Sequence, residues 1–202
     1  MMKTPSMPCR PTMILIAGLA LLLAGSARAI ADEQTGQYTI IGLFSPDREK
    51  DLRDVLENIS EFQLVQLDYE NARATIRYDL HALMPEQNPK KPPKPEQIIE
   101  RLNNILGRES DYTFSVRPAS TVPPERLTKL ELKVGILDCK GCRYAAYLAV
   151  MKADGVDRAT VGADSVVTAW IDPSKTDRAG VEAALKKARI ECLAKPAVGG
   201  RQ

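Results

Sequence analysis

Histidine, aromatic residues and long apolar runs are all scarce in this sequence. Of its 202 residues, one is histidine (His81), one is tryptophan and 5% are aromatic. Zinc in a structural site usually takes four cysteine or histidine ligands. Because the one histidine lies in the first half and the close cysteines lie in the second, we do not expect a cysteine–histidine zinc site.

The apolar stretch near the N-terminus, 13–24, has 12 residues, whereas a membrane-spanning helix needs about 20. Lys3 and Arg10 precede the stretch, and Ala27-Arg28-Ala29 follows it. This order is typical of a cleavable signal peptide, predicted over 1–29, with a retained anchor as the alternative. We therefore expect a periplasmic or secreted protein that has no membrane contact after cleavage.

A surplus of basic charge is also missing once this segment is set aside. The first 29 residues contain three basic residues and no acidic residue. The rest of the chain has 25 basic and 26 acidic residues, a net charge of −1. No basic surface is implied, so we expect no nucleic-acid partner.

Few cysteines remain after the signal segment, namely Cys139, Cys142 and Cys192. An odd number argues against a framework built only of disulfides. In an oxidising compartment, a close pair of thiols can form a disulfide unless a metal or a reductant protects it.

The second half of the chain has clear periodic patterns. Alternating or short apolar segments predict strands, and apolar stripes with i, i+3, i+4 spacing predict helices. The predicted strands cover 129–136, 156–161, 167–171 and 190–194, and the predicted helices cover 144–151 and 181–188. The order is βαββαβ, which places four antiparallel strands in one sheet with both helices on one face.

The first half repeats this plan. The predicted strands cover 38–42, 62–68, 73–78 and 112–116, the predicted helices cover 52–59 and 98–106, and a proline-rich loop covers 81–95. An internal repeat indicates two similar domains of an α+β protein. We assign the domains to 36–117 and 127–195, a proline-rich linker to 118–126, and a flexible tail to 196–202.

The most informative motif is Cys139-Lys140-Gly141-Cys142, which follows a predicted strand and begins a predicted helix. Unpaired backbone N–H groups at a helix N-terminus favour negative charge. The thiolate, rather than the thiol, binds metal. Lys140 and Arg143 should favour the thiolate form, whereas Asp138 should oppose it.

Two thiolates on one loop can approach linear two-coordination, which suits a soft ion such as Cu(I) or Hg(II). Cys139 and Cys142 are therefore the predicted metal ligands. Cys192 is a third candidate, because the last strand of a βαββαβ sheet begins near the end of the first. Its alternative role is that of a small buried strand residue. The predicted partners are the soft metal ion and a protein that donates or accepts it.

The second half, from about Leu127 to Ala194, resembles the heavy-metal-associated (HMA) domain family. The family signature is roughly Gly-Met-x-Cys-x-x-Cys, followed by a helix and then by Gly-Val; the matching stretches here are 136–142 and 155–156. The family includes copper chaperones, N-terminal modules of metal-pumping ATPases and periplasmic mercury-binding proteins. The resemblance implies two tandem ferredoxin-like domains, each with a four-stranded antiparallel sheet, and a metal held by Cys139 and Cys142.

The chain departs from this signature, because Ile136-Leu137 replaces Gly-Met. Leu137 can still be buried beneath the loop, whereas Ile136 stiffens a position that the family keeps flexible. In the first half, Ser45 and Arg48 stand where the sulfurs would lie. Ser45 followed by Pro46 predicts a helix cap and a helix start. We interpret the first half as a degenerate HMA-like domain with a structural or docking role.

Three functions are compatible with these patterns. The leading one is an exported protein that captures or transfers a soft metal ion and needs no catalysis. The second is a thiol–disulfide exchange protein that uses Cys139 and Cys142, although the rest of the pattern does not match a thioredoxin-like plan. The third is a protein-interaction module whose cysteines are vestigial or disulfide-bonded.

Overall fold

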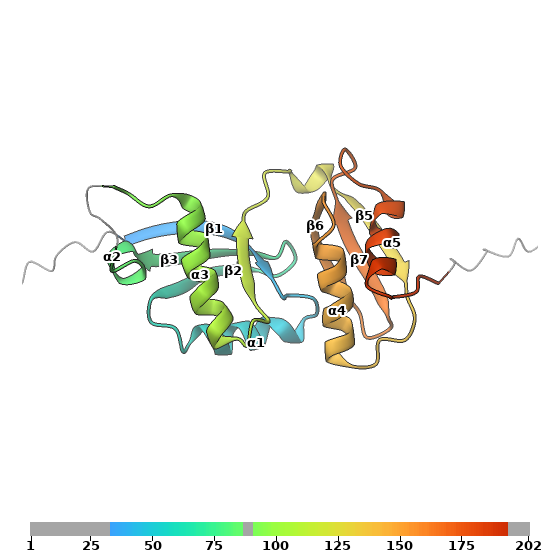
Figure 1. Cartoon of the computed structure of the whole chain (residues 1–202), viewed down its shortest axis with the longest axis horizontal. Helices are drawn as coiled ribbons and strands as arrows, with labels where there is room; N and C mark the ends of the chain where they lie inside the picture. The colour runs from blue at the N-terminus through green and yellow to red at the C-terminus, as the bar shows by residue number, and fades with distance from the viewer. Residues whose placement is uncertain (1–32, 87–90, 194–202) are drawn as a thin grey trace, which may run out of the picture. The chain divides into compact units, whose positions relative to one another are not determined.

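The computed structural model describes residues 33–86 and 91–193, which form two antiparallel sheets flanked by helices (Figure 1). The predicted signal peptide, 1–29, and the predicted tail, 196–202, lie outside these residues. The α+β class is confirmed, and so is the predicted βαββαβ order of the first half; the second half follows this order as far as its second helix.

The first sheet has four strands in the order β2-β3-β1-β4. Its strands are β1 (Glu33–Ile41), β2 (Phe62–Asp68), β3 (Arg73–Asp79) and β4 (Ser115–Pro118), and its long helices are α1 (Asp47–Leu56) and α3 (Pro95–Glu109). All neighbouring strands are antiparallel. This is the four-stranded arrangement predicted for the first half.

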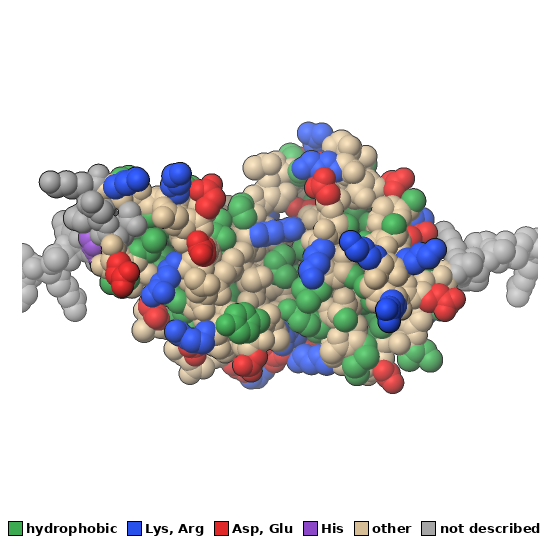
Figure 2. Space-filling model, viewed as in Figure 1, with side chains coloured by type: hydrophobic (Ala, Val, Ile, Leu, Met, Phe, Trp, Pro, Cys, Tyr) green, Lys and Arg blue, Asp and Glu red, His purple; other side chains and the backbone are tan. Residues whose placement is uncertain are grey.

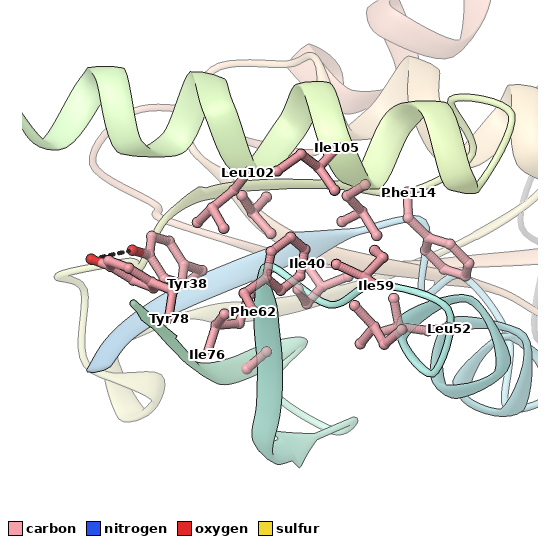
Figure 3. Close-up of a cluster of buried hydrophobic side chains, with 14 of the residues drawn as sticks. Tyr38, Ile40, Leu52, Ile59, Phe62, Ile76, Tyr78, Leu102, Ile105 and Phe114 are labelled. Carbon is pink, nitrogen blue, oxygen red and sulfur yellow. Dashed lines mark hydrogen bonds between the residues drawn. The ribbon is translucent and has the colours of Figure 1, made fainter. Parts of the chain in front are cut away.

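The first hydrophobic core lies between this sheet and the two helices (Figure 3). Strand alternation and helical stripes direct apolar side chains of both kinds of element into the same space. The side chains that meet there include Ile40 and Ile76 from the sheet, Leu52 from α1, and Leu102 and Ile105 from α3, each at most 2% exposed.

The second sheet has three strands in the order β5-β7-β6, with two helices on one face (Figure 1). Its elements are β5 (Thr128–Lys133), α4 (Lys140–Met151), β6 (Val156–Val161), β7 (Val166–Ile171) and α5 (Arg178–Lys187). A short 3-10 helix, η1 (Pro124–Arg126), lies within the predicted linker.

The predicted last strand, 190–194, is reduced to a single bridge between Val134 and Cys192. Backbone hydrogen bonds from Gly135 N–H to the Glu191 carbonyl (2.9 Å) and from Leu193 N–H to the Lys133 carbonyl (2.8 Å) flank this bridge. The segment therefore runs beside the end of β5, but the second sheet has three full strands instead of the predicted four.

The predicted closing strand of the first half, 112–116, begins later than expected. Asp111 and Tyr112 have positive φ angles of 50° and 59°, so the chain turns there before β4 begins at Ser115. Tyr112 is 79% exposed. The apolar alternation was misleading because it carries no information about this left-handed turn.

The predicted loop over 81–95 also begins differently, with a one-turn helix, α2 (Leu80–Leu83). The Asp79 carboxylate accepts hydrogen bonds from the N–H groups of His81 (2.7 Å) and Ala82 (3.0 Å). This side-chain cap satisfies amides that have no partner within the helix.

The described residues fall within one compact unit, and the two halves contact each other directly. Phe44, from the loop between β1 and α1, is 2% exposed and belongs to the core of the second half. At the free edge of β6, the Val161 N–H donates to the Phe44 carbonyl at 2.7 Å. At the other end of β6, Arg117 donates to the carbonyls of Val156 and Asp157. The first half thus covers an edge that would otherwise present unpaired backbone groups.

Both signs of charge are interspersed over the molecular face shown in Figure 2. Exposed pairs on α1, such as Lys50 with Asp54 (2.5 Å) and Arg53 with Glu49 (2.8 Å), illustrate this mixture. In the part of the chain that the structure describes, no helix combines the length and apolarity needed to cross a membrane.

Candidate metal-binding site

Cys139 lies at the N-terminal cap of α4, between the end of β5 and the helix, as the sequence predicts. Its backbone is extended (φ −107°, ψ 150°), and its sulfur accepts a hydrogen bond from the Cys142 N–H at 2.9 Å. The apolar alternation of β5 ends before the motif, and the helical stripe of α4 begins just after it. The first turn therefore directs an unpaired amide at the sulfur, which favours a thiolate at this position.

The sulfurs of Cys139 and Cys142 are joined in a disulfide. Cys139 is exposed and Cys142 is half-buried, so the pair lies at the surface and not in the interior. A reductant or an ion in solvent can therefore reach these sulfurs. Metal binding by these sulfurs would require reduction of the disulfide first, because the thiolate is the form of cysteine that binds metal.

Of the two apolar residues in the loop before the motif, Leu137 is buried and Ile136 is exposed to solvent. Leu137 is 7% exposed and packs in the second core, and its N–H donates to the Ser165 hydroxyl at 2.9 Å. Ile136 is 87% exposed. Leu137 is thus buried beneath the loop as expected and anchors the cysteines to the core.

Asp138 joins the two cysteines as a possible ligand. Among the described residues, the potential metal-ligand atoms of Asp138, Cys139 and Cys142 all lie within 4.8 Å of one another. From the sequence alone, Asp138 was expected only to oppose the thiolate charge. Its position directly before the first cysteine, on the loop side of the helix cap, was the available signal for a carboxylate near the sulfurs.

Cys192 belongs to a different part of the second half. It is half-buried, packs against the second core and forms the bridge with Val134. Burial raises the pKa of its thiol, and the Glu182 carboxylate adds to this effect. Within the described residues, the ligand group around Asp138 does not include Cys192, and its role as a third ligand stays a prediction.

Lys140, between the two cysteines, pairs with carboxylates of the first half. Its ammonium lies 2.7 Å from Asp51 Oδ2 and 3.2 Å from Asp47 Oδ2. The hydrogen bond from Lys140 is the main cause that lowers the pKa of Asp51, and the same bond is the main cause that raises the pKa of Lys140. The sequence predicts that Lys140 favours the thiolates, but it gives no sign of this pairing with the first half.

The corresponding loop of the first half is filled by an arginine. Arg48 is 8% exposed, and its guanidinium donates to the Gly42 carbonyl (3.2 Å), to Asp51 (2.6 Å) and to the Thr113 hydroxyl (3.0 Å). The expected cap at Ser45 is wrong: its hydroxyl donates to the Asp47 carboxylate at 2.6 Å, and Pro46 occupies the cap position without a side-chain bond.

Comparison with solved structures finds similar chains at low identity. The metallochaperone CopZ is 24% identical, aligns over 33% of this chain and 100% of its own, and gives a TM-score of 0.32. Oxidized MerP from Ralstonia metallidurans CH34 is 20% identical over 33% of this chain and 94% of its own, with a TM-score of 0.32. The water-soluble region of the P-type ATPase CopA from Bacillus subtilis is 13% identical over 85% of this chain and 99% of its own, with a TM-score of 0.33.

No protein-family model matches the chain, and no curated protein matches it. At the identities and scores above, the structural alignments do not establish a function.

Proposed function

We propose that this chain is an exported, non-catalytic protein that binds a soft metal ion through the thiolates of Cys139 and Cys142. The observation that carries the proposal is the placement of two surface sulfurs at the N-terminus of α4, with the Cys142 N–H directed at the Cys139 sulfur. Soft thiolates select soft ions, so Cu(I) and Hg(II) are the proposed cargo.

Metal capture requires a change in the state of the pair. A thiol reductant first supplies two electrons and two protons to the disulfide and yields two thiols. Binding of the cation then releases the thiol protons, because the ligands are thiolates. An exposed loop allows the same ion to pass onward to an acceptor protein, so transfer is part of the proposal.

Export is proposed from the N-terminal segment, 1–29, which has the charge order and small residues of a signal peptide. The mature protein would then act in the periplasm or outside the cell. N-terminal sequencing of the exported protein should begin near Ile30 or Asp32. An exported protein that retains Met1 would contradict cleavage.

Mass spectrometry of the reduced mature protein with Cu(I) or Hg(II) tests metal binding. We expect one equivalent to bind to the wild type and none to Cys139→Ser. Cys192→Ser decides whether Cys192 is a third ligand: if Cys139 and Cys142 are the only ligands, this variant keeps the ion with affinity changed less than about twofold. A loss of at least tenfold in that variant, about 1.4 kcal/mol, would make Cys192 a third ligand.

The disulfide supports one alternative, a thiol–disulfide exchange protein. An assay of insulin reduction on the same proteins separates the two functions. Insulin reduction without metal binding would favour exchange. If neither activity is found, an interaction module with structural cysteines becomes the better account.

A further inference from the structure

The first half of the chain reaches the metal site through a charged contact. Asp47 and Asp51 lie in the first turns of α1, and both carboxylates pair with Lys140, which is flanked by the two cysteines of the motif. The half that lacks cysteines therefore supplies carboxylates beside the half that carries them.

Packing between the halves fixes this contact. The Tyr147 hydroxyl on α4 accepts a hydrogen bond from the Gly42 N–H at 2.9 Å, and the rings of Phe44 and Tyr147 lie with centroids 5.8 Å apart. Asp51 is held on its other side by the buried Arg48, whose guanidinium lies 2.6 Å from the same oxygen that accepts from Lys140. The buried contacts between the halves thus bring the N-terminus of α4 to the start of α1, where Lys140 meets the two carboxylates.

The four charged side chains at this contact offset one another. Arg48 and Lys140 contribute two positive charges, and Asp47 and Asp51 contribute two negative charges. Two thiolates that bind a monovalent cation retain one negative charge. A free lysine beside them would stabilise that charge, as would the helix N-terminus. Because Lys140 is paired with Asp47 and Asp51, its positive charge does little to stabilise the negative charge of the thiolates.

We propose that Asp47 and Asp51 are positioning residues, which hold Lys140 so that it does not compensate the negative charge of the Cys139–Cys142 pair. The first half thereby weakens the grip of the site on a soft cation and makes the disulfide harder to reduce. The metal part of this inference rests on the proposed function, whereas the disulfide part does not. A weakened grip suits a protein that must release its ion to an acceptor.

The test uses the reduced full-length mature protein with both carboxylates neutralised, Asp47→Asn with Asp51→Asn. Competition with a chromophoric Cu(I) chelator should show affinity about threefold to tenfold tighter than in the wild type, the range expected for two exposed ion pairs. Titration of the metal-free protein with a thiol redox buffer should show the dithiol favoured by a similar factor, about 30 mV at tenfold. The single variant Asp47→Asn leaves the pair of Arg48 with Asp51 intact and should give part of both effects without disturbing the fold.

Asp54→Asn is the matched control, because it removes the same charge from α1 at a residue that pairs with Lys50 instead. Asp54→Asn should change neither the Cu(I) affinity nor the dithiol–disulfide equilibrium by more than about 1.5-fold, within the scatter expected of an exposed pair. The carboxylate substitutions are then repeated with Lys140→Gln, where the account predicts that their gain disappears.

An equal gain in the Lys140→Gln protein would overturn the assignment, since the carboxylates would then act without Lys140. No gain over Asp54→Asn would overturn it as well. If the wild type binds no Cu(I), the proposed function fails, but the redox titration still decides whether the carboxylates control the pair.

Discussion

At the scale of single residues, the contacts that matter most are polar groups placed where the two halves meet. The Tyr147 side chain is 1% exposed, and its hydroxyl is the acceptor for the buried amide of Gly42. Burial raises the pKa of Tyr147 to about 12, compared with about 10 for an exposed tyrosine. The stability of the contact between the halves should therefore depend on pH through the Tyr147 hydroxyl.

Tyr147→Phe should lower the free energy of unfolding by about 1–3 kcal/mol, because it leaves the Gly42 amide buried without a partner. A phenol whose pKa is higher in the folded state contributes stability that is complete below pH 10 and is lost as the pH rises toward 12. Urea titrations at pH 7 and pH 11 should therefore show a smaller alkaline loss in the variant than in the wild type. Equal alkaline losses in both proteins would show that Tyr147 does not carry this dependence.

At the scale of secondary-structure elements, the connection between β1 and α1 is shaped by a glycine. Gly42 has φ +111°, and a Cβ at this position would lie 2.4 Å from the Thr113 carbonyl oxygen. This left-handed backbone is open to glycine and strained for other residues. The turn lets the Phe44 ring leave the first sheet and enter the second core.

Gly42→Ala should destabilise the protein by about 1–3 kcal/mol, through strain at the positive φ and the close approach to Thr113. Gly135→Ala is the matched control, because a Cβ there would meet no atom within 4 Å and its φ is not in the left-handed range. The two changes are compared by urea unfolding. If the control is destabilised as strongly as Gly42→Ala, the cause is not the geometry of this turn.

The sequence was sufficient to predict the elements around the motif but not every boundary. The spacing of Tyr144, Tyr147, Leu148 and Met151 located α4, and the alternation before it located β5, because periodicity reports which face is buried. The start of β4 was missed because the left-handed residue at Tyr112 leaves no periodic signal. The short helix at Leu80 was missed because one turn is too short to show a stripe.

At the scale of the whole molecule, the two halves share a core residue and a charged contact. Phe44 lies in the chain of the first half and in the core of the second, and its ring is 5.6 Å from Tyr144, centroid to centroid. The sequence could not reveal this sharing, nor the pairing of Lys140 with α1, because both depend on how two separately patterned halves pack. The approximate local structure of the site was therefore predictable, whereas its charge environment was not.

Phe44→Ala should cost about 3–5 kcal/mol by opening a cavity in the second core. Because the substitution also weakens the link between the halves, we expect one unfolding transition in the wild type to become two in the variant. Differential scanning calorimetry measures both effects, with the exposed Val65→Ala as the control. Two transitions already present in the wild type would show that the halves unfold independently.

Binding of the ion by Cys139 and Cys142 is tested most directly by X-ray absorption at the copper edge, on the reduced mature protein loaded with one equivalent of Cu(I). We predict that sulfur dominates the first shell of the wild type. The signal of a bound sulfur pair should be lost in Cys139→Ser and retained in Cys192→Ser. A first shell of nitrogen and oxygen alone, or a spectrum unchanged in Cys139→Ser, would contradict binding by the two thiolates at the start of α4.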